Sequence, residues 1–499
     1  MPETTELRPG GATTTETHDR KRWLALYVLC AGMLMIVLDA TIVNVALPSI
    51  QADLGFSQAS LAWVLNAYLI PFGGLLLLAG RLGDLVGQRR VFLAGLGVFT
   101  GASLLCAVAP TQSVLIGARF VQGVGGALTS AVILGMIVTM FPEPAEQAKA
   151  IGVYGFVASA GGSIGLLAGG VLTDAINWHW IFFINLPVGV ATGALALKLV
   201  EGRPGVGLRQ GADAPGAALL TGGLMLGVFT ILGITEHGWT SVRTLALGAV
   251  SVALVTAFVV RQARVANPLM PLRLFRSRFV AGANVVQVLL VVGMFGMFFL
   301  GALYLQQILN YSALEVGLAF MPTTIVMGAM SLRVSGPMAM KYGSLAVLIP
   351  ALVFIGAGLV LFARTPVDGH FVTDVLPAMV LIGAGAGLGF PALAMTAMSG
   401  ATPQDAGLAS GLVNTSAQVG GAVGLAVLAT LAAQRTADQL TGGRVPAEAL
   451  NAGFHAAYLV GAALVAVAVV ISLTVLRPAM AAAVEADAGL EADALAEAA

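Results

Sequence analysis

The sequence predicts an all-α integral membrane protein with about fourteen transmembrane helices. Of its 499 residues, 58% are hydrophobic and only 10% are charged, whereas a soluble domain carries roughly 25% charged residues. The apolar residues fall in blocks of about 20, the length of helix that crosses about 30 Å of hydrocarbon. Many of the 63 glycines lie inside these blocks, where small side chains let helices approach closely. A soluble enzyme is therefore excluded, and the lipid bilayer is the expected surrounding.

The predicted spans follow one another along the chain, each assigned to one apolar block. They cover 23–46, 60–79, 91–109, 113–139, 151–173, 180–200, 216–234, 243–260, 279–305, 313–332, 345–363, 374–397, 405–431 and 453–476. Longer polar connections are expected at 201–214 and 261–278 on one side of the membrane. The longest connection on the other side is expected at 433–452.

The positively charged residues indicate which side of the membrane the connections face, because cytoplasmic loops are enriched in Lys and Arg. An even number of spans places both termini on the same side. If that side is the cytoplasm, 19 of the 24 Lys and Arg residues are cytoplasmic, 4 lie outside and Arg119 lies within a span. The opposite orientation inverts this ratio. We therefore expect a multi-pass protein of the bacterial cytoplasmic membrane with both termini in the cytoplasm.

Several classes of function find no support in the sequence. The formal net charge is zero, so no nucleic-acid partner is expected. Cys30 and Cys106 each lie within an apolar block and are interpreted as small core residues rather than a disulfide or metal pair. The five histidines are scattered, and no phosphate-binding Gly-x-x-x-x-Gly-Lys-[Ser/Thr] motif exists. We expect no catalytic residues, no metal and no cofactor.

Two charged residues lie well within predicted spans, Asp39 in the first and Arg119 in the fourth. Such charges are costly in a membrane and are candidates for function. Removal from water disfavours the charged form of a carboxylate, which brings proton uptake and release toward neutral pH. Asp39 is therefore predicted to be the proton-linked group of a proton-driven antiporter. The alternative is that Asp39 only pairs with Arg119 or caps polar backbone.

Arg119 shares one helix face with Gln122, Gly123 and Gly126. Its guanidinium stays charged, so it must face a cavity, a carboxylate or backbone carbonyls. Close to Asp39 it would favour the charged carboxylate, and moving away would favour the protonated form. This predicts a switch that couples proton binding to movement, provided that the two residues approach each other.

The cytoplasmic loop after the second span is predicted to be a conformational gate. Its defining residues are Gly80, Arg81, Asp84, Gly87, Arg89 and Arg90. The glycines permit a tight turn between two helices, and Asp84 can pair with Arg81 or Arg89 across it. The alternative is an ordinary solvated loop rich in positive charge.

Few polar or aromatic residues are available to line a cavity within the spans. The candidates are Asn44, Trp63, Asn66, Gln122, Tyr154, Gln287, Tyr304, Gln306, Asn414 and Gln418. A cavity with many apolar contacts and few charges suits lipophilic drugs, dyes or antibiotics rather than sugars or phosphates. For each of these residues, hydrogen bonding between helices is an equally expected role.

These motifs together resemble one family. Segments 38–48, 80–90, 115–127, 178–189, 268–276 and 304–312 are similar to motifs of the fourteen-span drug:proton antiporters of the major facilitator superfamily. The resemblance covers about residues 20–476. Two departures are visible. Leu166 stands where the fifth-helix antiporter motif carries proline, and the loop at 333–345 lacks an acidic counterpart of Asp84.

The resemblance implies the major facilitator fold and its organisation into parts. These are a six-helix bundle at 23–200, cytoplasmic linkers with two inserted helices at 201–278, and a second six-helix bundle at 279–476. Composition and the distribution of Lys and Arg add a disordered cytoplasmic amino terminus at 1–22 and an acidic cytoplasmic tail at 477–499. The resemblance also implies alternating access by rocking of the bundles around a midplane site. Asp39 then carries the proton, Arg119 is its coupling partner and Asp84 acts at the cytoplasmic gate.

We therefore expect proton-coupled secondary active efflux of small lipophilic drugs or antibiotics by a monomer. The expected partners are the substrate, protons and the bilayer. One alternative is a transporter dedicated to a single metabolite or self-produced antibiotic. A second alternative is a membrane sensor that moves nothing. The sequence assigns no role to Glu236, near the end of the seventh span.

Overall fold

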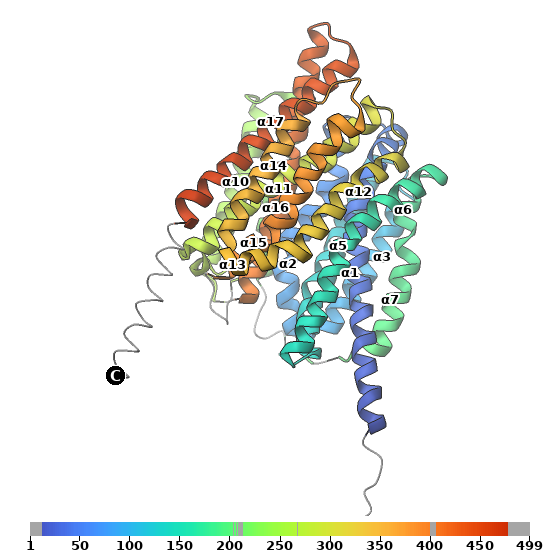
Figure 1. The fold of residues 1–499 in the computed structure, drawn as a ribbon, viewed down its shortest axis with the longest axis vertical. Coiled ribbons are helices and arrows are strands. Elements are labelled where there is room, and N and C mark those ends of the chain that lie inside the picture. The colour runs from blue at the N-terminus through green and yellow to red at the C-terminus, as the bar shows by residue number, and fades with distance from the viewer. Residues whose placement is uncertain are drawn as a thin grey trace, which may run out of the picture.

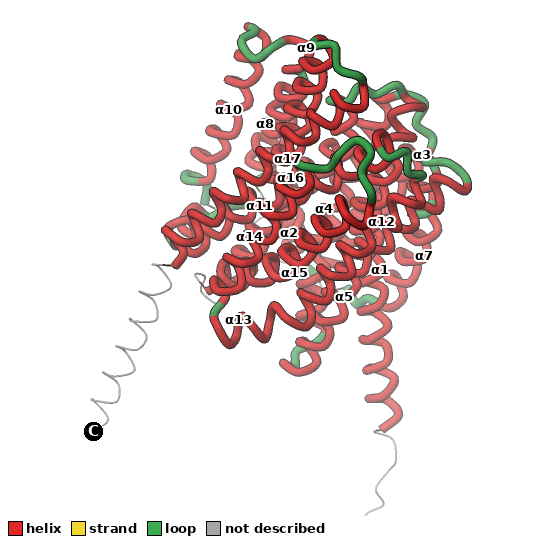
Figure 2. The backbone as a smooth tube through the Cα atoms, turned by 45° about the horizontal axis from the view of Figure 1, so that its top comes forward, coloured by secondary structure: helices red, strands yellow, loops and turns green. Residues whose placement is uncertain are grey.

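The computed structural model describes residues 12–202, 204–205, 207, 213–266, 268–399 and 406–477. Over these residues the regular structure is entirely helical, and the connections are short (Figure 2). Figure 1 shows an elongated bundle in which α1 begins and α17 finishes toward the same end. We call this the termini end and the other the opposite end.

The helices fall into three consecutive sets along the chain. The first set is α1 (Ala12–Leu54), η1 (Ser60–Ala62), α2 (Trp63–Val86), α3 (Gln88–Ala107), α4 (Gln112–Met140), α5 (Pro144–Ala175), α6 (Trp180–Phe183) and α7 (Asn185–Leu199). The second is α8 (Ala214–Leu232), α9 (Ile234–His237), α10 (Val242–Gln262) and η3 (Leu272–Arg276). The third is α11 (Arg278–Leu303), η4 (Tyr304–Ile308), α12 (Ala313–Ala329), η5 (Met330–Ser335), α13 (Gly336–Tyr342), α14 (Ser344–Phe362), η6 (Phe371–Val375), α15 (Leu376–Ser399), α16 (Ala406–Thr441), α17 (Pro446–Ile471) and η7 (Ser472–Leu476).

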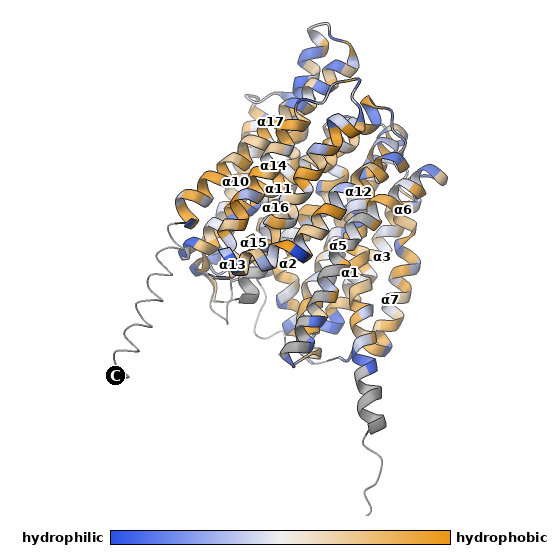
Figure 3. Cartoon of the chain, viewed as in Figure 1, coloured by the Kyte–Doolittle hydropathy of each residue, from blue (hydrophilic) through white to orange (hydrophobic). Residues whose placement is uncertain are grey.

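The number of membrane-crossing helices agrees with the sequence. Among the described residues, 13 helices are long and apolar enough to cross a membrane. The 32-residue helix α5 is not among these 13, and it contributes the shorter apolar stretch Ile164–Ala175. Since α5 packs along both α1 and α12, it completes the set of fourteen. Apolar residues cover the sides of the bundle and hydrophilic residues gather at its two ends (Figure 3).

Packing divides the chain into two six-helix bundles with a helix pair inserted between them. In the amino-terminal bundle, α1 packs on α5 and α7, while α4 packs on α2 and α3. In the carboxy-terminal bundle, α11 packs on α16 and α17, while α15 packs on α12 and α14. The inserted pair, α8 and α10, packs on itself, and α8 also contacts α2 and α16. This is the architecture expected from the resemblance.

A buried carboxylate fixes the base of the inserted pair. Asp213 caps α8 by accepting from the Gly216 N–H at 3.0 Å. It also accepts from Arg261 Nε at 2.6 Å and from Gln262 Nε2 at 2.7 Å, both at the end of α10. Burial alone would raise the pKa of Asp213, but these hydrogen bonds outweigh it and hold the pKa below its usual value.

Two connections are more helical than predicted. The expected outer loop at 433–452 is wrong, because α16 continues to Thr441 and α17 already starts at Pro446. Residues 432–441 include three Ala and two Gln, which favour helix even outside the membrane, and proline is favoured at a first helical position. The loop expected at 333–345 is likewise largely helical. Its helix α13 ends at Gly343, whose φ of 87° stops the helix.

The chain ends differ from the expectation in a smaller way. Helix α1 already begins at Ala12, inside the segment 1–22 for which no structure was expected. The acidic tail expected after Arg477 lies outside the described residues.

Candidate functional site

The two charges predicted inside the membrane meet within the amino-terminal bundle. Asp39 on α1 and Arg119 on α4 are both fully buried, with 0% exposure. Arg119 Nη1 donates a hydrogen bond to Asp39 Oδ2 at 2.5 Å. The approach of these residues, on which the predicted coupling switch depends, is therefore present in the structure.

Two neutral side chains complete the coordination of the carboxylate. Gln122 Nε2 donates to Asp39 Oδ1 at 2.8 Å, and Asn185 Nδ2 donates to the same oxygen at 3.0 Å. Both amides also donate to Ser103 Oγ, at 3.2 and 3.0 Å. We call these five residues the Asp39 network. Its members come from α1, α3, α4 and the start of α7, so the network ties four helices of one bundle together.

The guanidinium of Arg119 is held from several sides. Its Nε donates to the Val64 carbonyl at 3.0 Å, and its Nη1 donates to Gln122 Oε1 at 2.8 Å. The cation lies over the Tyr68 ring at 4.4 Å and over the Phe182 ring at 5.7 Å, where the aromatic faces attract it. Among the described residues Arg119 Nη2 has no hydrogen-bond partner.

Local helix geometry explains how these groups converge. Residues three apart share a helix face, which places Gln122 beside Arg119 on α4. On the same face, a Cβ at Gly126 would lie 3.0 Å from the Phe72 ring, so glycine allows α2 to pack closely. Sequence reasoning missed Ser103 and Asn185. Asn185 is a polar residue in an apolar stretch and could have been found by the rule applied to Asp39, whereas Ser103 carries no such signal.

The predicted gate loop forms the turn between α2 and α3. Gly87 has a φ of 107°, a conformation that favours glycine and ends α2. Asp84 is exposed, and in this part of the described chain it forms no ion pair with Arg81 or Arg89, so the predicted pairing is wrong for this conformation. Arg89 Nη2 instead donates to the Leu197 carbonyl at 2.5 Å, since the carbonyls at the end of α7 attract a cation.

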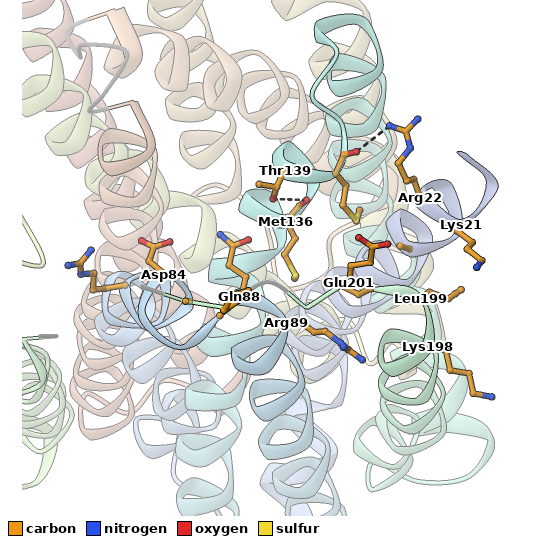
Figure 4. Close-up of a pocket in the computed structure, with 18 residues that line it drawn as sticks. Lys21, Arg22, Asp84, Gln88, Arg89, Met136, Thr139, Lys198, Leu199 and Glu201 are labelled. Carbon is orange, nitrogen blue, oxygen red and sulfur yellow. Dashed lines mark hydrogen bonds between the residues drawn. The ribbon is translucent and has the colours of Figure 1, made fainter. Parts of the chain in front are cut away.

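A cavity of about 610 Å³ opens at the termini end of the amino-terminal bundle (Figure 4). Of the predicted gate residues, Arg81, Asp84, Gly87 and Arg89 line it. It is also lined by Lys21 and Arg22 from the first third of α1, by Lys198 in the last turn of α7, and by Glu201 just after α7. The cavity is strongly charged, unlike the apolar substrate cavity that the sequence predicts.

The predicted cavity residues lie in different places. Tyr304 is fully buried in the carboxy-terminal bundle, and its hydroxyl donates to the Pro366 carbonyl at 2.7 Å. Gln306 Nε2 reaches across to the Val45 carbonyl of α1 at 2.7 Å. Gln122 belongs to the Asp39 network. These three side chains therefore have protein partners, and a role in substrate binding stays a prediction for them.

The remaining candidates have few partners or local ones. Asn44 donates to the Ala40 and Thr41 carbonyls of its own helix, and Tyr154 contacts Met33. Asn66 is fully buried, and neither of its amide atoms has a partner among the described residues. The others differ in exposure: Gln287 is buried, Trp63 and Gln418 are half-buried, and Asn414 is exposed. None of these residues lines the charged cavity at the termini end.

Comparison with known proteins identifies the family. Residues 29–425 match the Major Facilitator Superfamily model. The puromycin resistance protein pur8 of Streptomyces alboniger is 38% identical over 450 residues, which cover 90% of this chain and 89% of that protein. The cephamycin export protein CmcT of Amycolatopsis lactamdurans is 39% identical over 437 residues, covering 87% and 89%.

Solved structures agree with the fold. A bacterial homologue of the human lysosomal transporter Spinster, in an inward-facing and unoccupied conformation, superposes with a TM-score of 0.65. The identity is 15%, and the superposition covers 92% of this chain and 97% of that one. Members of the family are transporters rather than enzymes. The described helices, the family match and the relatives lead to one conclusion: the chain is a multi-pass membrane protein of the major facilitator superfamily.

Proposed function

We propose that the chain exports small lipophilic antibiotics across the cytoplasmic membrane in exchange for protons, by alternating access, with both termini in the cytoplasm. The family match and the antibiotic resistance and export relatives support transport of this substrate class. The distribution of Lys and Arg supports the orientation, in which the termini end faces the cytoplasm.

The observation that carries proton coupling is the buried pair of Asp39 and Arg119. When Asp39 takes up a proton, it loses its charge, and the Oδ atom that binds the proton becomes a donor. The guanidinium is then left without a counter-ion in a fully buried place, which is strongly unfavourable. Helices α1 and α4 must shift, or the guanidinium must find other acceptors. The change of charge is thereby converted into movement within the amino-terminal bundle.

The conformation supports alternating access. Among the described residues, the hydrogen bonds that join the two bundles lie in the half toward the opposite end, including Gln307 to Gln51 at 2.8 Å. The gate residue Asp84, at the termini end, is exposed and forms no ion pair with any residue that the structure describes. We interpret this as a state that is closed to the outside and open toward the cytoplasm, from which an exporter loads its substrate.

A transporter dedicated to one antibiotic remains the second candidate. The observation that favours it is that two relatives at 38% and 39% identity are each named for a single compound, puromycin or cephamycin. The two candidates share the fold and the proton coupling and differ only in the range of compounds that the substrate cavity accepts.

Efflux from energised cells tests the proposal. Cells that express the wild type, Asp39→Asn or Asp53→Asn are loaded with ethidium or puromycin, with and without a protonophore. Asp53 is the matched control, because it is an exposed carboxylate on the same helix, and among the described residues its side chain accepts only from Trp178 Nε1, at 2.9 Å. We expect uphill efflux by the wild type and Asp53→Asn, and loss of uphill efflux with Asp39→Asn or the protonophore. Efflux of puromycin without ethidium would favour the dedicated transporter, and uphill efflux by Asp39→Asn would exclude the role of Asp39.

A further inference from the structure

From the contacts between the bundles we infer that Asp174 is the outer latch of the transport cycle. Its carboxylate caps the first turn of α12 across the bundle interface and holds the outer side closed. The inference rests on the proposed alternating access, and it adds a gating residue at the end of the molecule remote from the motif around Asp84.

The latch consists of two hydrogen bonds between the bundles. Asp174, in the last turn of α5, accepts from the Ala313 N–H through Oδ1 at 3.1 Å. It accepts from the Leu314 N–H through Oδ2 at 2.8 Å. Both carboxylate oxygens of Asp174, in the amino-terminal bundle, thus accept hydrogen bonds from the backbone of the carboxy-terminal bundle. The negative charge lies at the positive end of α12.

The start of α12 depends on this carboxylate. Four N–H groups at the start of a helix lack partners within the helix. Ser312 and Glu315 form a capping box: the Ser312 N–H donates to the Glu315 side chain at 2.8 Å, and the Glu315 N–H donates to Ser312 Oγ at 3.2 Å. The two N–H groups between them, those of Ala313 and Leu314, donate to the carboxylate of Asp174. The cap of α12 is therefore shared between the two bundles.

Close packing of α5 against α12 supports the latch. A Cβ at Gly170 on α5 would lie 2.7 Å from the Ala313 carbonyl, and a Cβ at Gly317 on α12 would lie 2.6 Å from the Leu166 carbonyl. Glycine at both positions lets the two backbones touch, although Leu166 replaces the proline of the family motif. Figure 1 shows α5 and α12 side by side along this contact.

The position of the latch suits a contact that must break in every cycle. Asp174 is exposed, so water can replace both hydrogen bonds when the bundles separate. When the outer side opens, the amides of Ala313 and Leu314 lose their protein acceptor while the capping box of α12 stays intact. The contact therefore raises the population of the state with a closed outer side only modestly and does not prevent opening.

Distance measurements between spin labels test the latch on the full-length protein in lipid nanodiscs. Labels are placed on cysteines introduced at Pro110 in the amino-terminal bundle and at Asp368 in the carboxy-terminal bundle. Both are exposed at the opposite end. The native Cys30 and Cys106 are buried and are expected not to react. Each variant is also assayed for substrate transport in proteoliposomes.

We expect Asp174→Ala to increase the ratio of long to short distances by roughly tenfold, as for loss of a helix cap. Asp174→Asn keeps one acceptor oxygen and should give a smaller increase. Asp53→Asn, a carboxylate at the same end whose contact lies within one bundle, should match the wild type. A distribution for Asp174→Ala equal to that of the wild type would overturn the latch. If the wild type transports no substrate but Asp174→Ala still shows the expected distance shift, the result would count against the proposed function alone.

Discussion

The Asp39–Arg119 pair makes a prediction that double substitution can test. Arg119→Gln removes the cation and leaves Asp39 with two neutral donors, Gln122 and Asn185. Removing one partner of a buried ion pair destabilises a protein by about 3–5 kcal/mol, because the other charge stays buried without compensation. Asp39→Asn leaves Arg119 buried without a counter-ion, because its acceptors are then all neutral: the Val64 carbonyl, Gln122 Oε1 and the one oxygen that the substitution at position 39 retains.

The double variant, Asp39→Asn with Arg119→Gln, buries neutral groups only. We expect it to be more stable than Arg119→Gln by about 1–3 kcal/mol, although it carries one more substitution. The measurement is the free energy of unfolding of the four purified proteins in mixed micelles, titrated with a denaturing detergent. If the effects of the two single substitutions simply add, the pair contributes no coupling energy and the reasoning is refuted. Both single variants and the double variant should lack proton-coupled transport.

Three further predictions concern other parts of the molecule. Asp213→Asn should lower the free energy of unfolding at neutral pH by about 1–3 kcal/mol, since three donors lose their charged acceptor. Because the folded-state pKa of Asp213 lies below the usual 3.8, the wild type keeps this stability at neutral pH and loses it as the pH falls below about 4. The measurement is the free energy of unfolding as a function of pH. The prediction is contradicted if this free energy changes with pH in the same way for the wild type and for Asp213→Asn. Tyr304→Phe should reduce stability by about 1 kcal/mol and leave the set of exported compounds unchanged, because the hydroxyl is engaged by Pro366. A changed compound profile would show that Tyr304 faces the substrate. Asp84→Asn should slow transport without changing which compounds bind, as judged by initial rates and binding titrations. An altered set of bound compounds would argue against a gating role.

Much of the fold follows from the sequence, because bilayer thickness sets the length of each apolar block. The helical spans were found from hydropathy alone, and Asp39 and Arg119 stood out because ionised groups are rare at membrane depth. Helix extensions beyond the membrane were missed, as in α16 up to Thr441, since hydropathy does not distinguish a water-exposed helix from a loop.

The site was predicted only in part. Ser103 and Asn185 join the Asp39 network through contacts between helices that lie far apart in the sequence, and no local pattern specifies such contacts. Asp84 illustrates a second limit, because it forms no ion pair within the described part of the chain in this conformation, and gate contacts change with the conformational state. The contact of Asp174 with α12 also joins helices far apart in the sequence, so no local sequence pattern predicts it.

Proton movement during substrate exit tests the central claim most directly. Proteoliposomes that contain the purified protein are loaded with ethidium, whose charge does not change with pH near neutrality, and the internal pH is followed with an entrapped dye. As ethidium leaves down its gradient, we expect the lumen to acidify with the wild type and with Asp53→Asn. With Asp39→Asn, ethidium should leave without acidification. Equal acidification by Asp39→Asn, or ethidium exit through the wild type without any acidification, would contradict proton coupling through the Asp39 network.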